Sequence, residues 1–171
     1  MVKVIFIDDN YLYQNFPLPT RLERASLLSI IQLEQFTSMQ DILGTCLYSD
    51  LEQKVYDQSL SSSEEEFFKL VKYSLAMYSA KAAVSLLRTQ TAHTKNEERA
   101  QDQYVLDTIL STIESKVAYV NKRLVNFIKN DEALYAIATA DGCTDDIFTE
   151  EDAYQGSVFY PKNGVNENIC E

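Results

Sequence analysis

The stretch over residues 61–91 restricts this chain most, because it holds neither glycine nor proline and keeps a helical period throughout. Two apolar sets recur at spacings of three and four residues, which places them on neighbouring faces of one helix. The sets are Phe67, Val71, Leu75, Tyr78, Ala82 and Leu86, and then Tyr73, Met77, Ala80, Val84 and Leu87. A helix that is apolar over so much of its circumference packs between other helices. The sequence therefore predicts a long central helix within a helical bundle, without a reactive side chain.

Two capping boxes predict where helices begin. Ser62 with Glu65, or the pair one residue further along, has the S-x-x-E spacing in which each side chain accepts a hydrogen bond from the other residue's N–H. Thr20 with Glu23 has the same spacing ahead of an apolar pattern over residues 21–36. We therefore predict one helix over residues 21–36 and the start of the central helix just after residue 61.

Further helices are expected on both sides of the central one. Ser38 is placed to cap a short turn over residues 39–43, which Gly44 closes in a C-cap position, and a helix follows at residues 46–58. After Asn96, a long amphipathic helix should lie antiparallel to the central helix. Its apolar stripe is Leu106, Ile109, Leu110, Ile113, Val117, Val120, Leu124 and Phe127. Residues 131–140 either continue this helix or restart as a short one.

The N-terminal residues have a different pattern. Residues 2–7 are β-branched and aromatic, and they predict a short strand. A lone strand needs a partner for its backbone, either the C-terminal tail or another subunit. An aromatic linker follows, and Pro17 and Pro19 favour an extended entry into the helical region.

The C-terminal segment, residues 141–171, combines structure-breaking residues and acidic residues with large apolar ones. Asp141 and Gly142 interrupt the helical pattern, and further glycine, proline and asparagine residues follow. The segment nevertheless carries the aromatic residues Phe148, Tyr154, Phe159 and Tyr160. We interpret it as an arm that becomes ordered on a surface, its own or a neighbour's, with these four aromatics as partner-binding residues.

These patterns define the expected fold class. It is mainly α, a four-helix-type bundle with two long antiparallel helices, a short N-terminal strand and an extended C-terminal arm. The three parts are residues 1–19 (strand and linker), 20–140 (helical domain) and 141–171 (arm).

Charge and cysteine usage exclude several classes of function. The net charge of −11 opposes gripping of a nucleic-acid backbone. No apolar run is long enough for a membrane span, and the N-terminus lacks the features of a secretory signal. Cys46, Cys143 and Cys170 are far apart and show no C-x-x-C spacing, so we expect reduced thiols in a reducing compartment.

No motif points to catalysis, a metal or a cofactor. The acidic pairs and runs do not have the spacing of an EF-hand, so we interpret them as solvated charge. His93 is the one histidine, and the E-x-x-H motif of di-iron bundles would need glutamate where Gln90 stands. Phosphate-binding loops are absent from a chain with four glycines. We therefore expect no enzyme activity and no cofactor.

Two segments carry a resemblance to a known family. Residues 41–51 (DILGTCLYSDL) join a short helix, a glycine corner and an aromatic-bearing helix, and residues 67–83 (FFKLVKYSLAMYSAKAA) form an alanine- and tyrosine-rich helix. With the long helix that follows, they resemble the head–tail connector (adaptor ring) proteins of tailed double-stranded DNA bacteriophages, most closely ring proteins of crAss-like phages. The similar region covers about residues 20–130.

The resemblance implies a structural virion protein. In this family, a ring of about twelve copies joins the portal protein to further tail or ring proteins, in the neck between capsid and tail, after assembly in the host cytoplasm. DNA passes through the channel without specific binding, which agrees with the negative charge of this chain. The alternative is a cytoplasmic helical adaptor or regulatory protein that binds a partner through its C-terminal arm.

Overall fold

The computed structural model describes residues 4–18, 22–92, 98–140 and 143. All regular structure in this part of the chain is helical, which confirms the mainly α class. In chain order the elements are α1 (Asp9–Asn15), α2 (Arg24–Glu34), the π-helix η1 (Gln35–Met39), α3 (Gln40–Leu43), α4 (Thr45–Asp57), α5 (Ser62–Ala92), α6 (Glu98–Asn130) and α7 (Glu132–Ala138).

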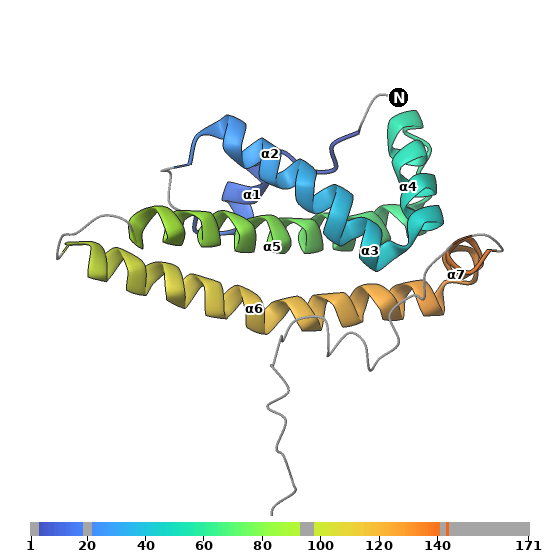
Figure 1. Cartoon of the computed structure of the whole chain (residues 1–171). Helices are drawn as coiled ribbons and strands as arrows, with labels where there is room; N and C mark the ends of the chain where they lie inside the picture. Colours follow the sequence, from blue (N-terminus) through green and yellow to red (C-terminus); the bar gives the residue numbers. More distant parts are fainter. Residues whose placement is uncertain (1–3, 19–21, 93–97, 141–142, 144–171) are drawn as a thin grey trace, which may run out of the picture.

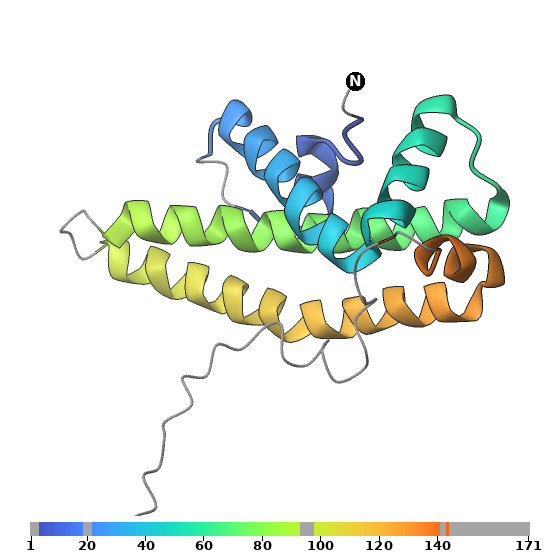
Figure 2. The same ribbon diagram turned by 45° about the vertical axis from the view of Figure 1, so that its right-hand side comes forward.

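Helix α5 occupies the centre of the fold, as its sequence predicted. It runs antiparallel to α6 along nearly its whole length, while α1 and α2 lie against its other side (Figure 1). The same layering is visible after rotation, with α4 standing across one end of α5 beside α7 (Figure 2). Burial of apolar surface on two sides of α5 is the main source of stability in such a fold.

The core contains most of the side chains that the helical period predicted. Leu75, Ile113 and Val117 are fully or almost fully buried, and Tyr78 and Leu110 are half-buried against the same core. The prediction for Leu86, the last residue of the first apolar set of α5, was wrong. Leu86 is 38% exposed, whereas Leu87 is 4% exposed, because the core has moved to the second apolar face by this point of α5.

The capping box of α5 lies one or two residues earlier than the sequence pattern suggested. The Ser61 backbone N–H donates to Glu64 Oε2 at 2.8 Å, and the Glu64 N–H donates to Ser61 Oγ at 3.4 Å. Ser63 instead donates its hydroxyl to Asp131 Oδ2 at 2.9 Å, which ties the start of α5 to the end of α6. The hydroxyl of Ser63 is therefore engaged with Asp131, and Ser61 serves as the cap.

One continuous rod replaces the predicted break at Ser38. Helix α2 begins at Arg24 rather than residue 21 and passes through the π-helix η1 into α3. Ser38 does not cap a new helix, because its hydroxyl donates to Glu34 Oε2 at 2.6 Å within the rod. The rod ends at Gly44, whose φ of 72° favours glycine and confirms the predicted corner.

The predicted N-terminal strand is not formed in residues 4–7. The backbone there pairs with a side-chain amide instead of a second strand: the Phe6 N–H donates to Gln35 Oε1 at 2.8 Å, and Gln35 Nε2 donates to the Val4 carbonyl at 2.7 Å. Gln35 Nε2 also lies 3.1 Å from the Tyr48 hydroxyl. Gln35 is 5% exposed and opens the π-helix, so this local widening of the rod coincides with the amide that holds the N-terminal segment.

Gln35→Ala should lower the free energy of unfolding by about 1–3 kcal/mol, because the substitution leaves a buried N–H and a carbonyl without partners. Urea unfolding of the variant measures this loss. Gln32→Ala is the matched control, since Gln32 is exposed on α2 and should change stability by less than about 0.5 kcal/mol. Equal unfolding midpoints for the two variants would contradict the assigned role of Gln35.

Helix α1 lies in the predicted aromatic linker and was not expected. Asp8 caps it, accepting the Tyr11 N–H at 2.8 Å, and Leu12 is fully buried. Asp9 forms a bidentate ion pair with Arg24, with nitrogen–oxygen distances of 3.0 and 3.1 Å. Both acids at this position are therefore structural, one as a cap and one as a link between α1 and α2.

The expectation of free thiols is wrong for two of the three cysteines. Cys46, at the start of α4, forms a disulfide with Cys143, and the two Cα atoms lie 5.6 Å apart. The two cysteines are 97 positions apart in the sequence, and no local sequence pattern predicts their pairing. Cys170 lies outside the described residues.

The end of the helical region resolves the alternative left open by the sequence. Helix α7 restarts after α6, and Asp131 caps it by accepting hydrogen bonds from the N–H groups of Ala133 and Leu134 at 3.1 Å.

Within the described residues, no helix combines the length and the apolar character needed to span a bilayer.

Candidate functional site

The described residues contain no cluster with the composition of a metal site. No three of their histidine, cysteine, aspartate or glutamate side chains converge on one point. His93 and the acidic runs after residue 144 lie outside the described part of the chain. The four predicted partner-binding residues, Phe148, Tyr154, Phe159 and Tyr160, lie outside it as well.

A half-open groove of about 290 Å³ lies where the end of α1 meets α5 and α6. Its floor is apolar and consists of Phe16, Tyr73, Met77, Ile109 and Ile113, all buried or half-buried. Its rim consists of five exposed residues, Asn15, Pro17, Thr108, Thr112 and Lys116. We call this feature the α1 groove.

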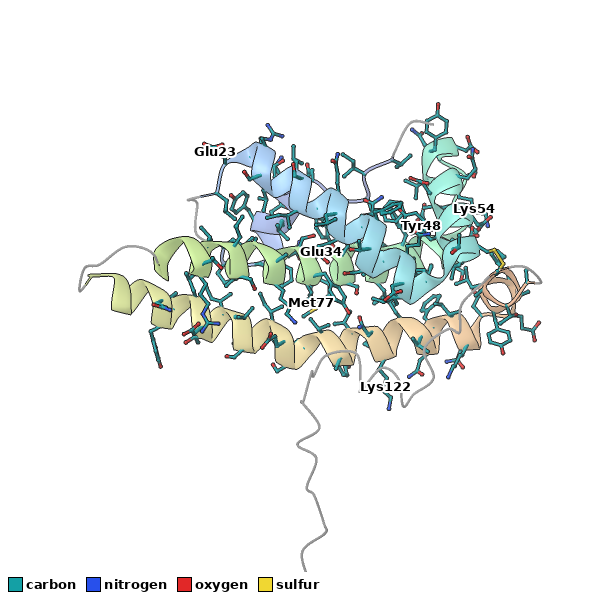
Figure 3. All side chains as sticks on the ribbon, in the orientation of Figure 1. Glu23, Glu34, Tyr48, Lys54, Met77 and Lys122 are labelled. Atoms are coloured by element: carbon teal, nitrogen blue, oxygen red, sulfur yellow. A yellow bond between two sulfur atoms is a disulfide. The ribbon has the colours of Figure 1, made fainter. Side chains whose placement is uncertain are left out.

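Aromatic stacking fixes the shape of the α1 groove. The ring of Phe16 stacks on that of Tyr73 with centroids 5.9 Å apart, which holds the end of α1 against α5. Met77 projects between α5 and α6 (Figure 3) and is 1% exposed. An apolar floor with polar groups and one cation at its rim suits an amphipathic guest, such as an aromatic side chain beside a carboxylate.

The middle of the outward side of α6 is a strip of uncharged residues over about four turns, and the exposed Lys116 lies at its edge. Tyr104 and Tyr119 mark its two ends and are 73% and 64% exposed. Between them, the outward positions are the exposed hydroxyl residues Thr108, Ser111, Thr112 and Ser115. We call residues 104–119 on this side the α6 outer face.

Hydrogen bonds within α6 satisfy the hydroxyl groups of this face. Thr108 donates to the Tyr104 carbonyl at 2.8 Å, and Thr112 donates to the Thr108 carbonyl at the same distance. The adjacent acids are turned toward α5, where Asp107 pairs with Arg88 at 2.9 Å and Glu114 with Lys81 at 3.3 Å. The solvent side of a helix usually carries charged or polar residues, and the middle of the α6 outer face carries polar residues without charge.

Four basic residues lie in the C-terminal half of α6. Lys116, Lys122, Arg123 and Lys129 are all exposed. Lys122 points away from α5 (Figure 3). Lys129 lies in the last turn of α6, where positive charge complements the helix dipole. Only Lys116 lines the α1 groove.

In addition to the ion pairs of Asp107 and Glu114, a hydrogen-bonded contact holds α5 and α6 in register. Asn121 Nδ2 donates to the Tyr78 hydroxyl at 2.6 Å, and the Ser74 hydroxyl lies 3.4 Å from Asn121 Oδ1. Burial raises the pKa of Tyr78, so its hydroxyl stays protonated well into the alkaline range. The contact fixes how the groove-lining residues of the two helices face each other.

The junction between α4 and α5 contains the most strongly shifted carboxyl group in the described residues. The ammonium group of Lys54 lies 2.6 Å from Glu64 Oε1 and 2.7 Å from Asp50 Oδ2. The hydrogen bond from Lys54, followed by that from the Ser61 N–H, lowers the pKa of Glu64 from its ordinary 4.5 to about 2. This cluster joins the two helices and is structural.

We expect the stability of the chain to fall between about pH 4.5 and 2 as Glu64 takes up a proton. The folded pKa lies below the unfolded one, so the contribution is complete above pH 4.5 and disappears as the pH falls toward 2. After allowance for solvent screening, we expect about 1–2 kcal/mol. Urea unfolding across this range measures it, and Glu64→Gln should flatten the slope there. An unchanged slope in Glu64→Gln would contradict the assignment.

The comparisons with known proteins identify no relative from which a function could be inferred. A scan against protein-family models, a search of curated proteins and a search of solved structures found no match to this chain.

The α1 groove was not predicted from the sequence, because its residues come from three separate segments. The α6 outer face was visible in the sequence as hydroxyl residues at helical spacing on the polar side of the helix.

Proposed function

We propose that this chain is a structural subunit of a virus particle, a head–tail connector that forms a ring between the portal and the tail of a tailed bacteriophage. In this proposal, the described helices form a four-helix-type domain built on two long antiparallel members. The arm after residue 143 binds a neighbouring protein. The resemblance of residues 41–51 and 67–83 to connector proteins supports the proposal.

The observation that supports the proposal is the strip of uncharged hydroxyl and tyrosine residues along the middle of the α6 outer face. A ring subunit must bury a surface of this kind against an identical neighbour through a repeated head-to-tail contact. Tyrosines with exposed rings are favoured at such contacts, because they add apolar area and keep a polar end. Tyr104 and Tyr119 stand at the two ends of this face.

The runner-up is a cytoplasmic helical adaptor that binds a partner through its arm. The disulfide between Cys46 and Cys143 favours the particle over this alternative. Disulfides are rare in the reduced cytosol, whereas they persist on virion surfaces. The bond would then form after assembly or release, when the particle meets oxidising surroundings.

The net charge of −11 agrees with a channel through which DNA passes. A negative wall repels the phosphate backbone and so lets the duplex slide without specific binding. In this proposal the ring lies in the neck of the virion, and it needs no cofactor and performs no catalysis.

The mass of the particle in solution tests the proposal. We expect native mass spectrometry of the full chain, alone or with its portal protein, to show a closed ring. Tyr119→Arg should abolish the ring, because it places an unpaired charge within each proposed contact. Tyr56→Arg is the matched control, since Tyr56 is 59% exposed on α4 and lies outside the proposed contact. A monomer under all conditions would favour the adaptor instead.

A further inference from the structure

We propose that the α1 groove receives an aromatic side chain of the C-terminal segment, residues 144–171, of a neighbouring copy. This inference rests on the proposed ring and names the surface to which the arm binds. The groove is formed by α1, α5 and α6, so it exists in each subunit before assembly.

The size of the groove suits one or two side chains. Its volume of about 290 Å³ is at the lower limit of small-molecule pockets, which span roughly 300–1,000 Å³. Its floor is apolar, with the stacked rings of Phe16 and Tyr73 on one side and Ile113 on the other. A planar ring gains most from such a floor, because aromatic side chains bury 150–250 Å² each.

Charge complementarity selects the C-terminal segment as the occupant. Residues 144–171 hold seven acidic residues and one lysine, so they carry a net charge of −6 out of −11 for the chain. Lys116 stands exposed at the rim of the groove and can pair with a carboxylate that flanks a bound ring. Phe159 and Tyr160 are adjacent aromatics within this segment, and we assign them as the anchor.

Chain length allows the segment to reach another subunit. It starts at Cys143, which the disulfide attaches to α4, and 28 residues follow. Fully extended, the 16 residues from Cys143 to the anchor at Phe159 span up to about 55 Å, whereas the rise of α6 from Lys116 to its end at Asn130 is only about 21 Å. The reach to the anchor is thus more than twice this rise.

The position of the groove indicates that the segment comes from a neighbour. Thr108 and Thr112 belong both to the rim of the groove and to the α6 outer face, so the groove opens directly beside the proposed contact between copies. A segment that enters there from the adjacent subunit extends that contact without a gap. Burial of the anchor rings in the groove would offset the entropy that the segment loses when it binds.

Photo-crosslinking within the assembled full-length protein tests the inference. Thr112→p-benzoylphenylalanine places the photoreactive group at the rim, and subunits grown with ¹⁴N and with ¹⁵N are mixed before assembly. After irradiation, we expect Thr112 to be linked to peptides from residues 144–171, with linked pairs of unlike isotope. Gln32→p-benzoylphenylalanine is the control, because Gln32 is exposed on α2 away from the groove.

Two variants test the chemistry of the contact. Lys116→Glu should lower the crosslink yield about five-fold, because it reverses the charge at the rim. Phe159→Ala combined with Tyr160→Ala should lower it at least ten-fold, as loss of an interface anchor does. Rings without crosslinks above the Gln32 control, or with links only inside single subunits, would overturn the inference and leave the proposed function standing. A protein that forms no ring would remove both.

Discussion

Replacing Cys46 or Cys143 with serine should lower the free energy of unfolding by about 2–5 kcal/mol, the largest effect we expect from any single change outside the core. The bond closes a loop across 97 positions, and a crosslink over so long a loop removes much of the conformational entropy of the unfolded chain. Urea unfolding of the oxidised protein and of each variant measures the loss.

Cys170→Ser provides the matched control, because it removes a thiol and leaves this bond intact. We expect its unfolding midpoint to equal that of the parent protein under oxidising conditions. Reduction of the parent with dithiothreitol should reproduce the loss seen in Cys46→Ser. If reduction leaves the midpoint unchanged, the disulfide contributes nothing to stability and the prediction is wrong.

Leu75→Ala should lower the free energy of unfolding by about 2–5 kcal/mol. Leu75 is fully buried in the middle of α5, where the packed helices on both sides cannot collapse into the space left by the side chain. Thermal or urea unfolding gives the value. Leu86→Ala is the control on the same helix, since Leu86 is 38% exposed and its loss should cost less than about 1 kcal/mol.

The comparison separates the two apolar faces of α5. Equal losses for Leu75→Ala and Leu86→Ala would show that a partner covers the end of α5 in solution. A small loss for both would mean that the core tolerates cavities, against the close packing of α5 between α6 and α2.

Local sequence patterns predicted the positions of the long helices, because the formation of a helix depends mainly on residues within a few turns of one another. The three–four spacing of apolar residues predicted α5 and α6, and Gly44 predicted the corner between α3 and α4. The same patterns failed where two local choices were close in energy. Ser61, Ser62 and Ser63 each precede a glutamate by three residues. The structure uses Ser61 with Glu64, which Lys54 also contacts, while Ser63 contacts Asp131.

The candidate site was predictable only in part. The C-terminal aromatics were selected from composition, and they lie outside the described residues. The α1 groove needed the fold, because Phe16, Met77 and Lys116 come from three helices and meet only after packing. Their separation in sequence exceeds the range over which periodicity carries information.

By itself, the sequence determined that the chain is mainly helical, where its long helices run and that they bury a common apolar face, since these depend on backbone propensity and on side chains a few residues apart. Only the tertiary structure decided the fate of residues 4–7, which pair with the Gln35 amide instead of a strand. It also joined Cys46 to Cys143 and assembled the α1 groove. These features depend on contacts between segments distant in sequence, and such contacts are chosen by the packing of the whole chain.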